Sequence, residues 1–123
     1  PNNPTGAVLT AEAMQRIAAA AERTGAWLLS DEIYRGAERN GVTTASFHDL
    51  GYERTLITAG LSKAYGAPGL RVGWIAGPPE RIAAIQGYHD YTTIMISTLS
   101  DLLAIRVLEK REQILERTRG ILR

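Results

Sequence analysis

The sequence predicts an α/β fold built on a mainly parallel sheet. Three short apolar runs, at residues 26–29, 55–59 and 72–76, have the length and composition of strands. Segments with the residue spacing of helices precede the first run and follow the third. Folds in which strands and helices alternate place their chemistry on loops at the strand ends, so we expect a site on the loops that follow the first two runs.

The first predicted helix has a signal at each end. Residues 11–24 are strong helix formers with an apolar face. Thr10 occupies the position of an N-cap, and Glu12 lies in the first turn, where a negative charge interacts favourably with the helix dipole. Gly25 follows as the stop signal. We therefore expect a helix over residues 11–24.

The predicted strands are separated by glycine-containing loops. The run at residues 26–29 is continuously apolar, which is typical of a buried parallel strand. Residues 35–52 and 60–69 contain several glycines and are expected to be loops. Trp27 and Trp74 fall in predicted strands, so we expect both indole rings to lie in the core.

The C-terminal third is predicted to be mainly helical. A helix is expected from Glu80 to about Tyr88, whereas the pattern of residues 91–96 is ambiguous. From Leu99 onward apolar residues recur at near-helical spacing, with an interruption at residues 110–113. Basic residues near the C-terminus alternate with glutamates, which predicts a solvated helix face.

Composition excludes several classes of protein. The 123 residues are 45% hydrophobic, which is enough for one core of ordinary domain size, and the formal net charge of +1 gives no sign of a nucleic-acid or membrane partner. The chain has no cysteine and only two histidines, His48 and His89, so we expect no disulfide and no metal site.

The sequence shows no signal peptide and no apolar run long enough to span a bilayer. We therefore expect a soluble, cytoplasmic protein. The chain opens on the turn-forming residues 1–6, lacks a start methionine and closes while a helical pattern is still running. These features favour a piece of a longer protein.

Three polar residues are candidates for a site. Lys63, one of only two lysines, lies in a glycine-rich loop directly after a predicted strand, where poor hydration would lower its pKa and make it a nucleophile. Lys110 falls on a charged helix face and is expected to be solvated. Asp31 follows the first strand and could bind a ligand or cap a turn. Arg71 could grip an anion or form an ordinary ion pair.

Three motifs resemble those of class I/II aminotransferases that depend on pyridoxal phosphate (PLP). Residues 60–73 closely resemble the family's lysine-attachment motif, residues 3–6 its Asn-Pro-Thr-Gly turn, and residues 30–34 its Asp-x-x-Tyr element. All three occur in the family's order and with similar separations. The resemblance covers essentially the whole chain.

The resemblance implies roles for the two central residues. Lys63 would form the internal aldimine with PLP, and would then act as general base and acid for the proton shift in the substrate. Asp31 would bond the pyridine nitrogen and keep it protonated, so that the ring can accept electrons.

The same resemblance assigns the remaining cofactor contacts. Asn3 and Tyr34 would approach the phenolic oxygen of the ring, and the resemblance is compatible with a cis bond between Asn3 and Pro4. Arg71 would pair with the phosphate. Many members carry a hydroxyl residue three places before the lysine, where this chain has Gly60, so Ser62 is expected to supply a hydroxyl instead.

For the fold, the resemblance implies part of a three-layer α/β/α sandwich of fold type I. Residues 1–98 would belong to the large PLP-binding domain, in which the third strand runs antiparallel to the others. Residues 99–123 would begin a long helix that leads towards a small domain outside this chain.

For the function, the resemblance implies transfer of an amino group between an amino acid and a 2-oxo acid by a homodimeric full-length protein. Two alternatives stay open. One is another PLP reaction on an amino acid, by a lyase, decarboxylase, synthase or oxidase, and the other is a PLP-sensing domain of a transcription regulator. We expect the isolated chain to be inactive.

Overall fold

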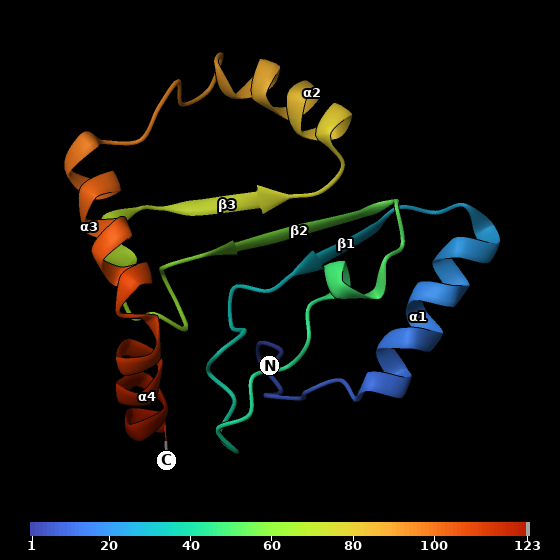
Figure 1. Cartoon of the computed structure of the whole chain (residues 1–123), viewed down its shortest axis with the longest axis horizontal. Coiled ribbons are helices and arrows are strands. Elements are labelled where there is room, and N and C mark those ends of the chain that lie inside the picture. The colour runs from blue at the N-terminus through green and yellow to red at the C-terminus, as the bar shows by residue number, and fades with distance from the viewer. Residues whose placement is uncertain (123) are drawn as a thin grey trace.

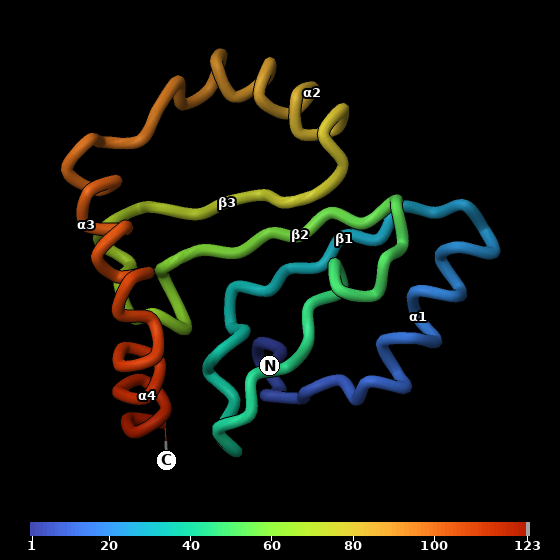
Figure 2. The backbone as a smooth tube through the Cα atoms, in the orientation of Figure 1, coloured from blue at the N-terminus to red at the C-terminus, as the bar shows by residue number. Residues whose placement is uncertain are grey.

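A computed structural model of the chain describes residues 1–122. Its elements, in chain order, are α1 (Ala11–Thr24), β1 (Leu28–Asp31), the 3-10 turn η1 (Phe47–Leu50), β2 (Thr55–Gly60), the 3-10 turn η2 (Pro68–Leu70), β3 (Gly73–Ala76), α2 (Pro79–His89), α3 (Thr98–Glu109) and α4 (Arg111–Leu122). Figures 1 and 2 show the sheet in the middle, with α1 towards one end of the strands, α3 and α4 at the other end, and α2 beyond β3. The alternation of strands and helices is the predicted one.

The sheet has the strand order β1-β2-β3 and is mixed. β1 and β2 are parallel, with Asp31 opposite Thr58, and β3 runs antiparallel to β2, with Gly73 opposite Gly60. The expected antiparallel third strand is therefore confirmed. Because β1 and β2 are parallel, both end at the same edge of the sheet, where Figure 1 shows their chains leading into loops.

Helix α1 has the predicted ends. The hydroxyl oxygen of Thr10 accepts a hydrogen bond from the amide of Ala13 at 3.2 Å. Gly25 ends the helix in the left-handed conformation, with φ of 66°, and its amide donates to the Glu22 carbonyl at 3.1 Å. Short-range capping chemistry thus determines where α1 begins and ends.

The core lies between α1 and one face of the sheet. Met14 and Ala18 of α1 pack with Leu28 of β1, Phe47 of η1 and Ile57 of β2. On the opposite face Leu29 is 68% exposed. Within residues 1–122 this face is therefore open around Leu29.

Both tryptophans were expected in the core, and this expectation is wrong. Trp27 is 40% exposed and Trp74 is 39% exposed. Trp27 precedes β1, which begins two residues later than predicted, and the guanidinium of Arg81 lies 4.8 Å from the centre of its ring. A cation stacked on an indole stabilises a partly exposed ring.

The C-terminal apolar pattern forms two helices rather than one. α3 ends at Glu109, Lys110 leaves the helical conformation with φ of −104° and ψ of 22°, and α4 starts at Arg111. The solvated face predicted for the basic residues is wrong for Arg119, which is 7% exposed. Within the described part of the chain, no helix is both long and apolar enough to cross a membrane.

Candidate active site

The predicted site lies at the edge of the sheet where β1 and β2 end. Asp31 is the last residue of β1, and the loop that carries Lys63 starts directly after Gly60, the last residue of β2. The amide of Ala64 donates to the carbonyl of Ile33 at 3.4 Å and so joins the two loops. The parallel pairing thus brings two residues 32 positions apart to one edge, as is usual for ligand sites in α/β sheets.

The carboxylate of Asp31 is held from one side. Its Oδ1 accepts hydrogen bonds from the Thr58 hydroxyl at 3.1 Å and from the Ile33 amide at 3.2 Å. No donor among residues 1–122 contacts Oδ2, which leaves this oxygen able to accept from a ligand. Thr58 was missed in the sequence, although its position on β2 opposite Asp31 could have indicated it once the strand register was assigned.

The backbone of the loop around Lys63 is closely packed. The amide of Leu61 donates to the Val72 carbonyl at 3.0 Å, and the amide of Ala67 donates to the Leu61 carbonyl at 2.9 Å. A Cβ on Gly60 would lie 2.9 Å from the Val72 carbonyl oxygen, so a side chain cannot be added there without a shift. The loop therefore has a defined shape that depends on glycine.

The lysine at the centre of this loop is exposed to solvent. Lys63 is exposed and Ser62 is half-buried. The expectation of a poorly hydrated lysine is therefore not met within this chain. Packing within the loop buries Leu61 and Ala64 and leaves the amine of Lys63 exposed.

Asn3 and Tyr34 line one cavity, and Asp31 lines an adjoining one. Asn3 and Tyr34 line a cavity of about 590 Å³, and the Asn3–Pro4 bond is cis. Asp31 lines a second cavity of about 210 Å³ that shares Asn2 and Glu38 with the first. Neither of these two cavities is lined by Lys63, Ser62 or Arg71.

Arg71 follows η2 at the end of the loop that carries Lys63. Its backbone is left-handed, with φ of 55°, and its Nη1 donates to the Pro68 carbonyl at 3.1 Å. Its guanidinium pairs with no carboxylate within the part of the chain described. The remaining donors of the exposed guanidinium are therefore available to an anion.

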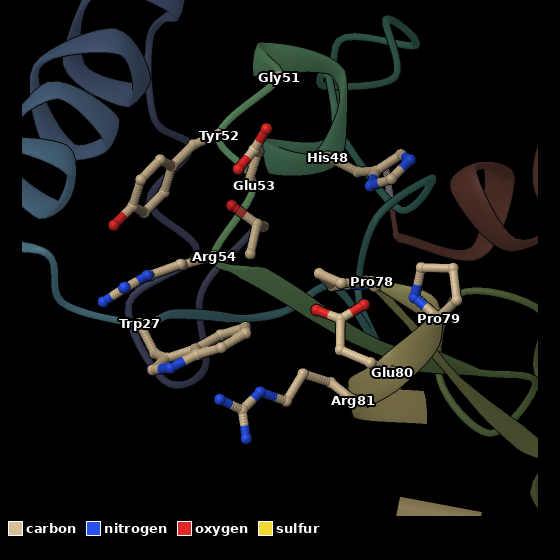
Figure 3. A pocket seen from close by; sticks show the side chains of 12 residues that line it. Trp27, His48, Gly51, Tyr52, Glu53, Arg54, Pro78, Pro79, Glu80 and Arg81 are labelled. Atoms are coloured by element: carbon tan, nitrogen blue, oxygen red, sulfur yellow. The ribbon is translucent and has the colours of Figure 1, made fainter. Parts of the chain in front are cut away.

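A further cavity lies at the opposite edge of the sheet (Figure 3) and contains none of the predicted site residues. It has a volume of about 660 Å³. Arg54 and Arg81 border it, but Arg54 donates to the Gly25 carbonyl at 2.6 Å and Arg81 stacks on Trp27. Both cations are thus engaged in holding the fold.

The types of the predicted site residues, at and near the edge of the sheet where β1 and β2 end, fit PLP. The carboxylate of Asp31 offers an acceptor for a ring N–H, the guanidinium of Arg71 has donors for a phosphate, and Asn3 and Tyr34 offer polar groups for a ring oxygen. Lys63 supplies an exposed primary amine close to the chain segment that holds Asp31.

Curated relatives match over most of this chain. An aspartate aminotransferase of Streptomyces avermitilis is 36% identical over 103 residues, which are 79% of this chain and 24% of the relative. An aspartate aminotransferase of Thermococcus kodakarensis is 31% identical over 119 residues, which are 97% of this chain and 32% of the relative. The chain thus spans a third or less of the length of these relatives.

Solved structures confirm the fold class. An aromatic aminotransferase from Pyrococcus horikoshii superposes with a TM-score of 0.89 at 29% identity, over 98% of this chain and 33% of that chain. A PLP-dependent aminotransferase from Streptococcus suis superposes with a TM-score of 0.81 at 35% identity, over 94% of this chain and 30% of that chain. The sequence profile of aminotransferase class I and II matches residues 1–122. The chain therefore belongs to the class I and II aminotransferase family.

Proposed function

We propose that these residues form part of a PLP-dependent aminotransferase that moves an amino group between an amino acid and a 2-oxo acid. The observation that supports this most directly is the common sheet edge, where Asp31 keeps one oxygen open and the Lys63 loop is bonded to the Asp31 loop. The names of the relatives agree with this reaction, because both curated relatives reported above are aminotransferases.

The reaction requires a proton to leave the substrate Cα and later to return. PLP, when bound, supplies an electron-accepting ring that stabilises the negative charge left at Cα. Lys63 would hold the cofactor through its Nζ amine, and it would carry the proton as general base and acid. Asp31 accepts the ring N–H and keeps the proton on that nitrogen, since a charge-assisted bond favours the charged form of its donor.

The other residues hold and orient the cofactor. Arg71 binds the phosphate through the guanidinium donors that its bond to Pro68 leaves open, and Ser62 adds a hydroxyl donor. Asn3 and Tyr34, which line one cavity, bind the ring oxygen. Together these contacts would restrict the bound cofactor to one orientation.

The whole protein is proposed to act as a cytoplasmic homodimer, with residues 1–98 in its large domain and residues 99–123 leading towards its small domain. An amino acid and a 2-oxo acid are its proposed substrates, without a nucleic-acid or membrane partner. The identity of the amino acid depends on contacts outside these residues, because Lys63 and Asp31 serve the cofactor in any such reaction.

The test uses the full-length protein and the two lysines of this chain. Protein mixed with PLP is reduced with borohydride, and the labelled peptide is identified by mass spectrometry. We expect the label on Lys63 and its loss in Lys63→Ala. The label should remain in the control Lys110→Ala, because Lys110 lies at the C-terminal end of α3 and is not a residue of the proposed site. Labelling that persists in Lys63→Ala would refute the assignment, and a screen of amino acids for 2-oxo acid formation tests the reaction.

A further inference from the structure

Helix α4 packs against both loops of the proposed site. Its buried residue Leu115 forms a cluster with Ala37, from the loop after Tyr34, and with Ala64, which follows Lys63. A Cβ on Gly36 would lie 2.9 Å from a methyl carbon of Leu115, so the backbone there is in close contact with the helix. Figure 2 shows α4 beside this segment.

Arg119, one turn after Leu115, bonds the same segment with two donors. Its Nε donates to the Gly36 carbonyl at 3.0 Å, and its Nη2 donates to the Thr43 hydroxyl at 2.9 Å. The side chain is buried, and its Nη1 lies 3.9 Å from the Glu116 carboxylate. The planar guanidinium thus fixes two points of one loop, which a lysine with its single ammonium cannot do in the same geometry.

The other side of α4 lies along the Lys63 loop. A Cβ on Gly66 would be 3.7 Å from Nη1 of Arg117 and 3.8 Å from the hydroxyl of Thr118. The same loop is bonded to the Tyr34 segment through the Ala64 amide and the Ile33 carbonyl. Helix α4, the loop that carries Lys63 and the segment that follows Tyr34 therefore each contact the other two.

We propose that Arg119 is a positioning residue of the active site, which acts through this contact to hold Tyr34 and Lys63 in place for the cofactor. The proposal rests on the function proposed above. Loss of the two Arg119 bonds frees the segment from Gly36 to Thr43, and the Leu115 cluster transmits that freedom to Ala64 and the adjacent lysine. In such a variant the two loops must become ordered when the cofactor binds, which weakens binding, whereas in the native protein they are already ordered.

The test compares full-length Arg119→Met, Arg119→Lys and Thr43→Val with the wild type. PLP dissociation constants are measured well below the unfolding temperature, and hydrogen exchange is followed in the proteins without PLP. We expect the dissociation constant to rise about tenfold in Arg119→Met, as for the loss of a charged hydrogen bond, with a smaller rise in Arg119→Lys and Thr43→Val. Exchange should increase in residues 36–44 and 62–66, while α1 stays protected.

The matched control is Arg111→Met, because Arg111 is an exposed arginine of the same helix whose guanidinium pairs with Glu112 at 2.7 Å. It should bind PLP like the wild type. Wild-type affinity in folded Arg119→Met would overturn the proposal, as would protection lost equally in α1. If Arg119→Met does not fold, wild-type affinity in Thr43→Val would overturn it. Failure of the wild type itself to bind PLP at Lys63 would instead refute the proposed function.

Discussion

Asp31 depends on a residue of the neighbouring strand. The sequence identifies Asp31 by its place after an apolar run, but its hydrogen bond to Thr58 spans 27 positions and follows from the parallel register. A threonine in a strand pattern is common for reasons of β propensity alone. The sequence therefore predicts the carboxylate and not the hydroxyl that orients it.

At Thr58, replacement by valine should weaken cofactor binding in the full-length protein. The substitution keeps the shape and removes the donor to Asp31 Oδ1, so the carboxylate can turn away from the ring nitrogen. We expect the PLP dissociation constant to rise about tenfold, the loss associated with one hydrogen bond to a charged group. Titration of PLP absorbance measures it, and unchanged affinity would show that Thr58 does not orient Asp31.

Thr55 on the same strand provides the control and a stability prediction. It is buried, and its hydroxyl has no hydrogen-bond partner among the described residues. Thr55→Val should leave PLP affinity unchanged and stabilise the fold by about 1 kcal/mol, because an unsatisfied buried hydroxyl is removed. Denaturant unfolding tests this, and a lower midpoint would mean that the hydroxyl has a partner in the full-length protein.

Among the elements, the ends of α1 are determined by neighbouring residues, whereas the position of α4 is determined by contacts with residues far away in the sequence. The ends of α1 follow from Thr10 and Gly25, which lie next to the helix. The position of α4 follows from Leu115 and Arg119, whose partners lie about 50 to 80 residues earlier in the chain. Alternating charge predicted a solvated face for this region, and for Arg119 this prediction is wrong. A pattern of charges cannot show that a carbonyl from another segment is within reach.

Glu12, in the first turn of α1, gives a prediction of how stability depends on pH. Hydrogen bonds from its own backbone amide and from Thr10 lower the pKa of Glu12. Because the pKa is lower in the folded state, the contribution of Glu12 to stability is present above its unfolded pKa and is lost as pH falls below about 4. Stability curves between pH 3 and 7 should lose a small acid-dependent component in Glu12→Gln, and identical curves would contradict this.

For α4, truncation of Leu115 should be costly. Leu115→Ala removes a buried side chain that fills the space between two loops, and we expect a loss of about 2–5 kcal/mol in unfolding free energy. Gln113→Ala, at an exposed position on the same helix, should change it by less than about 0.5 kcal/mol. Urea unfolding of the full-length variants measures both. Equal effects would place Leu115 outside the core.

At the scale of the whole molecule, the described residues leave much apolar surface open. Tyr91 is 91% exposed, and Leu29 lies on the open face of the sheet. Large exposed apolar areas usually mark surfaces that another segment or chain covers. This agrees with the fraction of the relatives that the chain spans, which is a third or less.

The isolated chain of residues 1–123 should therefore show little or no transamination. Its Lys63 is exposed, and Asp31 and Tyr34 line separate cavities, so the groups that would act on one cofactor are not enclosed together. Formation of 2-oxo acid by the purified chain, compared with the full-length protein at equal concentration, measures this. Turnover at a comparable rate would contradict it.

The sequence by itself determined the order of strands and helices, the ends of α1 and the motifs that carry Lys63, Asp31 and Arg71. These features depend on chemistry within a few neighbouring residues, such as caps, turn residues and apolar runs. Only the tertiary structure decided the exposure of Trp27, the bond of Thr58 to Asp31 and the burial of Arg119. Each of these depends on which distant segments become neighbours, and that is determined by packing of the whole chain rather than by local preference.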